Sequence, residues 1–227
     1  MHTLMIADDH PLFREAIAAV IEADLPDSRL LEAESLGEAL RRAETCAELD
    51  LVLLDLGLPD ASGLEGLRAL RAAHPWLAVA ILSTDQQRCT ILDALDLGAV
   101  GYIPKSTPRR NLLMALALLL EGQVYLPPDI MRRPTVPCSS VVNAETPSPG
   151  PRVAGLTDKQ LEVLIRLNRG ASNKVIAREL NIAETTVKTH VSAILRKLEV
   201  AGRVQAILAV GEVDLEALLA ERHDPSR

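Results

Sequence analysis

Five short apolar runs alternate with amphipathic segments through residues 1–125, and this pattern limits the possible folds more than any other feature of the chain. Each run has the length of one buried strand, whereas the segments between them repeat apolar residues every three or four positions, as helices do. Strands and helices in alternation form a parallel sheet that helices cover on both faces. The expected strands are 3–7, 29–33, 51–55, 78–82 and 100–103, and the expected helices are 11–24, 36–47, 63–73, 87–97 and 108–121.

Seven of the fourteen prolines lie between residues 126 and 152, where serines are interleaved with them. Proline fixes its own backbone and donates no hydrogen bond, so we expect neither helix nor central strand in this stretch. Its composition is typical of a semi-extended linker. The chain of 227 residues is therefore expected to consist of a domain at 1–125, a linker at 126–152 and a smaller domain at 153–222.

The C-terminal part is expected to be helical throughout. Thr157 and Gln160 have the spacing of a capping box ahead of an apolar run, and Asn181 suits the left-handed residue of a tight turn. A short helix, a tight turn and a longer basic helix form a helix-turn-helix. The expected helices run from Thr157 to Gly170, from Ser172 to Leu180, from Glu184 to Leu198 and from Arg203 to Ala220.

Charge is divided unevenly between the two parts of the chain. Residues 1–125 carry 10 Lys+Arg against 19 Asp+Glu, whereas residues 156–210 carry 9 against 5. This asymmetry favours an anion as the partner of the C-terminal domain. The three cysteines show neither metal-ligand nor disulfide spacing, no secretory signal is visible, and the apolar run at 112–120 is too short for a bilayer. We therefore expect a cytoplasmic protein with no membrane partner.

Carboxylates follow two of the expected strands. Asp8 and Asp9 come directly after the first strand, and Asp55 ends the third. Ligands of an open parallel sheet bind beyond the carboxyl ends of its strands, where Ser83 and Lys105 would add a hydroxyl and a cation. Three neighbouring carboxylates repel one another unless a cation neutralises them, and oxygen ligands suit Mg²⁺. Such a cluster either holds a metal only, or uses one carboxylate to accept a phosphoryl group.

Residues 1–125 resemble the receiver domain of two-component response regulators. This resemblance implies a doubly wound, five-stranded parallel sheet of the flavodoxin-like kind. It also implies that Asp55 is the phosphoacceptor, and that Asp9, Asp55 and the carbonyl of Gly57 bind Mg²⁺ while Asp8 assists directly or through water. The matching residues are Asp8-Asp9, Leu53-Leu54-Asp55-Leu56, Leu58-Pro59-Asp60, Gly63, Ser83, and Gly98-Ala99-Val100-Gly101-Tyr102 through Lys105.

The same resemblance assigns the residues that would respond to the phosphoryl group. Ser83 would hydrogen-bond a phosphoryl oxygen, Lys105 would pair with its charge, and Tyr102 would turn inward as the switch aromatic. Two positions depart from the usual pattern. Thr84 stands where receivers usually carry a smaller alanine, so access to the acceptor is expected to be narrower. Asp85 lies where the family tunes hydrolysis of the phosphoaspartate.

Residues 156–210 resemble the LuxR/FixJ-type helix-turn-helix, and together with the receiver the chain resembles a response regulator of the NarL/FixJ class. Ala183 stands where the family often has serine or threonine, so the reading helix is expected to lack an N-cap. The matching residues are Leu156-Thr157, Glu162-Val163-Leu164, Gly170, Ser172-Asn173-Lys174, Ile176-Ala177, Leu180, Ile182, Thr186 through Val191, Ile194-Leu195, Lys197-Leu198 and Arg203.

The residues expected to contact DNA lie on one face of the third C-terminal helix. Lys188, Thr189 and Ser192 share that face, whereas Lys174 and Arg203 would hold phosphates from outside it. Lysine donates to guanine or phosphate, and threonine offers a methyl group to thymine or a hydroxyl to the backbone. The opposite face is apolar and expected in the core, with Val187, Val191, Ile194 and Leu195.

The resemblance thus implies a regulator of transcription rather than an enzyme, apart from self-phosphotransfer onto Asp55 and autodephosphorylation. A sensor histidine kinase would phosphorylate Asp55 and alter the surface near helices 87–97 and 108–121, or release the linker. A homodimer would then bind duplex DNA at half-sites about one helical turn apart, with RNA polymerase as a further partner.

Three other functions are open from the sequence. The receiver could be a dimerisation scaffold in a phosphorylation-independent transcription factor, although the intact set Asp8, Asp9, Asp55 and Lys105 argues against it. A metal-dependent phosphohydrolase with Asp55 as nucleophile would need a substrate-covering insertion, and none is visible in residues 1–125. An RNA-binding antiterminator is disfavoured by the helix-turn-helix pattern.

Overall fold

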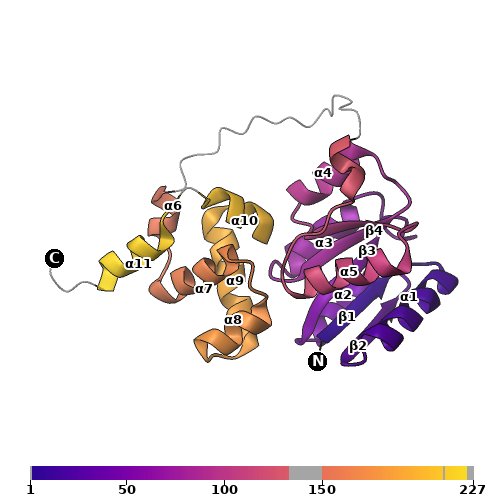
Figure 1. Ribbon diagram of the computed structural model, residues 1–227, viewed down its shortest axis with the longest axis horizontal. Helices are drawn as coiled ribbons and strands as arrows, with labels where there is room; N and C mark the ends of the chain where they lie inside the picture. Colours follow the sequence, from indigo (N-terminus) through magenta and orange to yellow (C-terminus); the bar gives the residue numbers. More distant parts are fainter. Residues whose placement is uncertain (1, 133–149, 212, 224–227) are drawn as a thin grey trace.

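The computed structural model describes residues 2–132, 150–211 and 213–223 (Figure 1). Its N-terminal part confirms the expected alternation. Five parallel strands form one sheet in the order β2-β1-β3-β4-β5. The strands are β1 (His2–Ala7), β2 (Ser28–Ala33), β3 (Leu49–Asp55), β4 (Ala78–Ser83) and β5 (Gly101–Pro104). The helices between and after them are α1 (Pro11–Asp24), α2 (Leu36–Thr45), α3 (Glu65–Ala73), α4 (Arg88–Asp96) and α5 (Arg109–Leu120).

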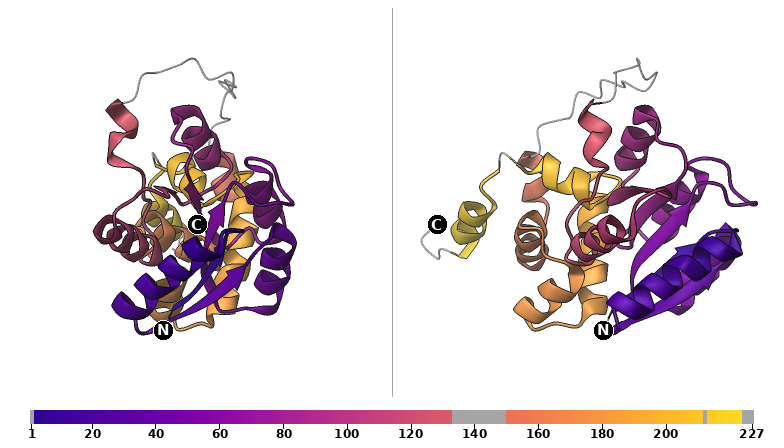
Figure 2. Two further views of the ribbon diagram at one scale, coloured as in Figure 1. Left: turned by 90° about the vertical axis from the view of Figure 1, so that its right-hand side faces the viewer. Right: turned by 45° about the vertical axis from the view of Figure 1, so that its right-hand side comes forward.

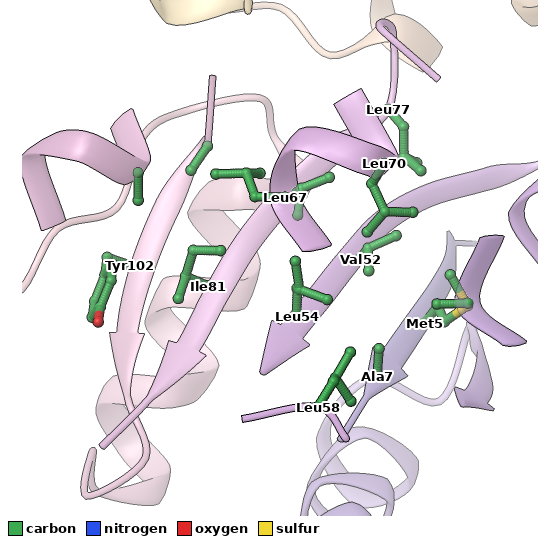
Figure 3. Close-up of a cluster of buried hydrophobic side chains, with 14 of the residues drawn as sticks. Met5, Ala7, Val52, Leu54, Leu58, Leu67, Leu70, Leu77, Ile81 and Tyr102 are labelled. Atoms are coloured by element: carbon green, nitrogen blue, oxygen red, sulfur yellow. The ribbon is translucent and has the colours of Figure 1, made fainter. Parts of the chain in front are cut away.

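Both faces of the sheet are covered by helices, which explains why the strands are continuous apolar runs. Successive residues of a strand point to opposite faces, so Met5 packs in one core and Leu4 in the other. The core on the Met5 side receives α2, α3 and α4, and Figure 3 shows Leu67 and Leu70 of α3 lying over the strands. The core on the Leu4 side receives α1 and α5.

The C-terminal part is a separate helical core, as expected. Its helices are α6 (Gly150–Ala154), α7 (Asp158–Asn168), α8 (Asn173–Leu180), α9 (Glu184–Leu198), α10 (Arg203–Ala209) and α11 (Leu215–His223). The single helix expected over 203–220 is wrong, because the chain turns after Ala209 and a second helix begins at Leu215. Asp214 explains the new start, since its carboxylate accepts a hydrogen bond from the backbone N–H of Ala217.

The helix ends of this part confirm the expected capping. Thr157 and Gln160 form both hydrogen bonds of a capping box at the start of α7. Asn181 ends α8 in the left-handed region, at φ 52°. Ala183 occupies the N-cap of α9 and provides no side-chain hydrogen bond to it. The turn between α8 and α9 is therefore fixed by backbone conformation, whereas the start of α9 lacks the usual side-chain support.

The proline-rich stretch is less extended at its ends than expected. A 3₁₀ helix, η1 (Pro128–Arg132), follows the receiver, and α6 begins at Gly150. Proline is accepted in the first turn of a helix because its missing N–H needs no partner there, which the expectation overlooked. Ile130 also packs into the receiver core, beyond residue 125. Residues 133–149 of the expected linker lie outside the described residues.

The two parts of the molecule are in contact. Figures 1 and 2 show the orange C-terminal helices beside the N-terminal part, which they meet through residues of α8, α9 and α10. The contact leaves a small cavity of about 40 Å³ between the parts, lined by His2, Trp76 and Lys174 among others. Over the described residues, the structure contains no helix with the length and apolar character that a bilayer crossing requires.

Candidate functional site

The expected carboxylates meet where the strand order reverses. Asp8 and Asp9 follow β1 and Asp55 ends β3, the neighbouring strand in the sheet. Lys105 follows β5 and brings its Nζ to 2.8 Å from Asp8 Oδ2 and to 2.8 Å from Asp55 Oδ2. Asp8 and Asp55 are buried, so the ammonium group offsets the repulsion of two carboxylates that water barely reaches.

The electrostatics of Lys105 follow from this bridge. Burial alone would lower the pKa of the Lys105 ammonium group, but hydrogen bonds and charges from Asp55 and Asp8 outweigh it and raise the pKa. The Phe13 ring lies beneath the ammonium group, with its centroid 4.9 Å from Nζ. Lys105 is therefore a fixed positive charge at the cluster.

Asp55 lines a cavity of about 730 Å³ at this edge of the sheet. Ser83, at the end of β4, and Gly57 line the same cavity, together with Thr84 at its exposed rim. The Ser83 hydroxyl and the Gly57 backbone therefore lie in the same cavity as Asp55, the expected phosphoacceptor. The cavity is open to solvent, so a donor molecule can reach Asp55 without a change in the sheet.

A hydrogen-bond network behind Ser83 connects the site to α4. The backbone N–H of Asp85 donates to Ser83 Oγ at 3.0 Å, and the buried Tyr102 hydroxyl donates to the Asp85 carbonyl at 2.7 Å. The Asp85 carboxylate accepts from the N–H of Gln87 at 2.8 Å and from the hydroxyl of Thr90 at 2.8 Å. The Tyr102 side chain is buried, and both Asp85 carboxylate oxygens are engaged with the start of α4 instead of facing the acceptor.

Two further side chains hold this edge together: Arg14, which the sequence did not single out, and Asp60, which it gave only as part of a matching motif. Arg14 of α1 donates to the carbonyl of Asp8 at 2.8 Å and forms ion pairs with two glutamates of the β2 end. Asp60 accepts hydrogen bonds from Leu36 and Gly37, the first residues of α2. These N–H donors lower the pKa of the Asp60 carboxyl. Their partners are some twenty residues away, so spacing within a motif could not reveal them.

The cluster has the donor set of a cation site. One donor atom from each of Asp8, Asp9, His10 and Asp55 lies within 4.8 Å of the others. Three buried or half-buried carboxylates in such proximity fit a divalent cation such as Mg²⁺, which prefers oxygen ligands. His10 was not expected here, and its only signal in the sequence is its place directly after Asp8-Asp9.

The reading helix α9 has its expected two faces, but its polar face is not open. Val187 and Ile194 are fully buried in the C-terminal core, as predicted. Lys188 is only 5% exposed because its ammonium group enters the receiver. It donates to the carbonyls of Ala47 and Leu49 and lies 4.4 Å from the centre of the Trp76 ring. The receiver thus binds the side chain that was expected to read DNA.

The other expected DNA contacts are also engaged within the chain. Lys174 Nζ lies 3.4 Å from Asp50 of the receiver. Arg203 is half-buried and donates to the carbonyl of Ala171 at 2.9 Å, and burial lowers the pKa of its guanidinium to about 10. Ser192 donates to the Lys188 carbonyl at 3.0 Å. Thr189 is exposed and donates to Thr185 of its own helix at 3.0 Å.

A second contact between the parts lies at the loop before α10. Arg71 of α3 donates twice to the carbonyl of Ala201, at 2.6 and 3.1 Å, and burial lowers the pKa of its guanidinium to about 10. Gly98, after α4, lies so close to Gly202 that a Cβ on Gly202 would be 2.7 Å from the Gly98 Cα. The receiver is therefore fitted to the C-terminal part at both α9 and α10.

Comparisons with known proteins agree with this geometry. The sequence model of the response regulator receiver domain matches residues 4–117, and that of bacterial regulatory proteins of the luxR family matches residues 154–210. The Glycerol metabolism activator of Pseudomonas putida is 48% identical over 219 residues, covering 96% of this chain and 99% of that protein. The nitrate/nitrite response regulator NarL of Escherichia coli (strain K12) is 32% identical over 208 residues, 92% and 94% of the two chains.

Solved structures show the same fold. A LuxR family DNA-binding response regulator from Silicibacter pomeroyi is 34% identical, with a TM-score of 0.51 over 57% of this chain and 99% of that chain. The RcsB–DNA complex has a TM-score of 0.54 at 21% identity, over 93% of this chain and 98% of that chain.

Proposed function

Because the chain belongs to the response regulators that join a receiver domain to a LuxR-family DNA-binding domain, we propose that phosphorylation of Asp55 controls when it binds DNA and regulates transcription. One observation carries the proposal. The receiver that contains Asp55 also holds Lys188, the expected DNA-reading side chain, in a buried contact. The same domain therefore contains the proposed phosphoacceptor and covers the side chain that is proposed to read DNA.

The geometry of Asp55 supports an acceptor of phosphoryl groups. A carboxylate oxygen of Asp55 attacks the phosphorus of a phosphohistidine on a sensor kinase, forming a P–O bond as the P–N bond breaks. The electron pair of the broken bond returns to the histidine nitrogen. Lys105 and the backbone of Gly57 flank the acceptor, and Ser83 lies within the same cavity. When bound, Mg²⁺ at Asp8, Asp9, Asp55 and the Gly57 carbonyl would offset the negative charge that builds up on the transferring oxygens.

The phosphoryl group brings roughly two negative charges to a site that holds a hydroxyl and an ammonium group. Ser83 Oγ now accepts from the N–H of Asp85, so turning toward a phosphoryl oxygen removes that bond. Asp85 is joined to Tyr102 and to the first turn of α4. At the other end of α4, the Leu95 carbonyl accepts from Gln205 of α10. A shift of α4 would thus weaken the contact between the two parts.

Release of that contact exposes the polar face of α9 for duplex DNA. The freed protein is proposed to bind as a homodimer, and RNA polymerase is a further proposed partner. Because bacterial DNA lies in the cytoplasm, we place the protein there. Enzymatic activity is confined to self-phosphotransfer onto Asp55 and to autodephosphorylation.

Trp76 provides a direct test, because it is the single tryptophan of the chain and lies against Lys188. The protein is treated with an acyl phosphate and Mg²⁺, and tryptophan emission, oligomeric state and promoter-DNA binding are followed together. We expect a red shift of the emission, dimerisation and tighter binding for the wild type, and none of these for Asp55→Ala. A response of Asp55→Ala equal to that of the wild type would contradict control by phosphorylation of Asp55.

The most similar protein reported above suggests a class of target. The Glycerol metabolism activator of Pseudomonas putida matches this chain over nearly its whole length. We infer that this protein also activates genes for the use of glycerol. The test compares binding of the acyl-phosphate-treated protein to promoter fragments of glycerol genes and of unrelated genes from its own genome. Equal binding to both sets would contradict the inference.

A further inference from the structure

His10 lies directly over the carboxylate cluster, although neither sequence pattern nor family resemblance gives it a role. It occupies the N-cap position of α1, and its backbone N–H donates to Asp8 Oδ1 at 3.0 Å. Pro11 follows at the first helical position, so the backbone on both sides of His10 is restricted. The imidazole lines the cavity that contains Asp55.

The imidazole nitrogen faces the carboxylates. Nδ1 lies 2.7 Å from Asp9 Oδ1 and 3.3 Å from Asp8 Oδ1, although the ring is 68% exposed. Adjacent ligands of an octahedral ion, each at about 2.1 Å from it, are about 3 Å apart, and opposite ligands are about 4.2 Å apart. The donor atoms of Asp8, Asp9, His10 and Asp55 all lie within 4.8 Å of one another. The two distances from His10 Nδ1 to the carboxylates of Asp9 and Asp8 are those of adjacent ligands in one coordination shell.

We propose that His10 is a direct nitrogen ligand of the receiver's cation, and that it gives this site a preference for Mn²⁺ over Mg²⁺. The inference rests on the proposed function, because it assumes that the receiver binds a divalent cation at Asp8, Asp9 and Asp55. Mg²⁺ favours oxygen ligands and retains water, whereas imidazole nitrogen binds more strongly to first-row transition ions. Three carboxylates with one imidazole form a mixed set that suits Mn²⁺.

The competing explanation is a hydrogen bond between His10 and Asp9 at the surface, with the cation bound by oxygen atoms alone. The two explanations differ in one observable. A bound imidazole transfers spin density from Mn²⁺ to its nitrogen, whereas a histidine that only neighbours a carboxylate does not. The full chain loaded with Mn²⁺ alone is therefore examined by electron spin-echo envelope modulation, which detects a coordinated ¹⁴N.

We expect nitrogen modulation in the wild type, its loss in His10→Gln, and its retention in His2→Gln. His2 is a matched control because it begins β1, the strand whose other end leads into Asp8. Affinities for Mn²⁺, from the resonance of the free ion, and for Mg²⁺, by competition, complete the test. His10→Gln is expected to weaken Mn²⁺ binding by about tenfold or more, with Mg²⁺ binding changed less than about twofold.

The outcomes separate this inference from the proposed function. Mn²⁺ binding without nitrogen modulation in the wild type overturns the role of His10 and leaves the carboxylate site intact. Modulation that persists in His10→Gln, or an equal loss of both affinities, also overturns it. Absence of any Mn²⁺ or Mg²⁺ binding by the wild type removes the cation site itself, and with it the proposed route to phosphorylation. A wild-type spectrum without nitrogen modulation overturns the inference by itself, and modulation in the wild type is assigned to His10 by its loss in His10→Gln.

Discussion

At the scale of single residues, Lys105 has the largest predicted effect on stability. Its ammonium group bridges the buried carboxylates of Asp8 and Asp55, so Lys105→Gln leaves two like charges facing each other. Breaking a buried ion pair by removing one partner costs about 3–5 kcal/mol, and we expect the free energy of unfolding to fall by the lower end of that range. Urea unfolding of both proteins in the presence of EDTA measures this difference in unfolding free energy.

Two comparisons test this explanation of the Lys105 effect. Adding Mg²⁺ should stabilise Lys105→Gln more than the wild type, because a cation replaces the lost charge. The double variant Lys105→Gln/Asp55→Asn should recover much of the loss, because one carboxylate is gone. Equal effects of Mg²⁺ on the two proteins would show that carboxylate repulsion is not the cause.

The pH dependence of the Lys105 bridge has a definite sign. Folding raises the pKa of Lys105 above its ordinary value of 10.5, so the protonated lysine stabilises the folded state. At a pH below 10.5 the lysine is protonated in both the folded and the unfolded chain, and the bridge then contributes its full stability. That gain is complete below the ordinary pKa and is lost as the pH rises through the higher folded pKa. The difference in unfolding free energy between wild type and Lys105→Gln should therefore be constant near neutrality and shrink only above pH 10.5.

Residues of the site differ in how far the sequence could predict them. Asp8, Asp9, Asp55, Ser83 and Lys105 end or follow strands, so the strand pattern alone predicted their meeting at one edge. The contacts of Lys188 could not be predicted in this way. Its hydrogen-bond partners on the receiver are about 140 positions earlier in the chain, and they are backbone carbonyls, which carry no sequence signal.

At the scale of elements, the start of α9 lacks the side-chain cap that the starts of α7 and α8 have. Ala183 adopts the extended backbone of an N-cap but offers no acceptor to the first turn. Ala183→Ser should therefore raise the free energy of unfolding by about 0.5–2 kcal/mol. Ser172→Ala is the matched comparison, because Ser172 caps α8 through its hydroxyl, and it should lower the stability by a similar amount.

Chemical unfolding followed by far-ultraviolet circular dichroism measures both variants. A serine at 183 that leaves the midpoint unchanged would mean that water already satisfies the first turn of α9.

The element borders themselves were predicted best where local chemistry sets them, as in the capping box of α7. The break between α10 and α11 was missed because apolar residues continue past Val210, where α10 ends, and the carboxylate of Asp214 caps a new helix.

At the scale of the whole molecule, the proposed function predicts that the closed arrangement lowers the affinity for DNA. A protein whose binding-competent form is a minor population binds with an apparent Kd raised by the inverse of that population. Minor states of two-state proteins are commonly about 0.1–10% populated. A variant that opens the molecule without altering α9 should therefore bind DNA tighter without phosphorylation.

Gly202→Ala is such a variant. Gly202 has an ordinary extended φ of −161°, so alanine fits its backbone, but the new Cβ would lie 2.7 Å from the Gly98 Cα and 3.0 Å from the Gly98 carbonyl oxygen. The clash exists mainly across the interface, with backbone that cannot move aside as a side chain does. We expect at least about a tenfold lower Kd for promoter DNA, a red-shifted Trp76 emission and little further gain on acyl phosphate treatment.

Gly211→Ala serves as the matched control, because a Cβ there meets only ordinary contacts at 3.5 Å and beyond, just past the opposite end of α10. It should retain the wild-type affinity and the wild-type response to acyl phosphate. If Gly202→Ala shifts the Trp76 emission to the red without lowering the Kd for DNA, release of α9 is not sufficient for tight binding and dimerisation limits the affinity. If it changes neither, the contact at α10 does not hold the molecule closed, and Lys188 in its receiver pocket carries the restraint alone.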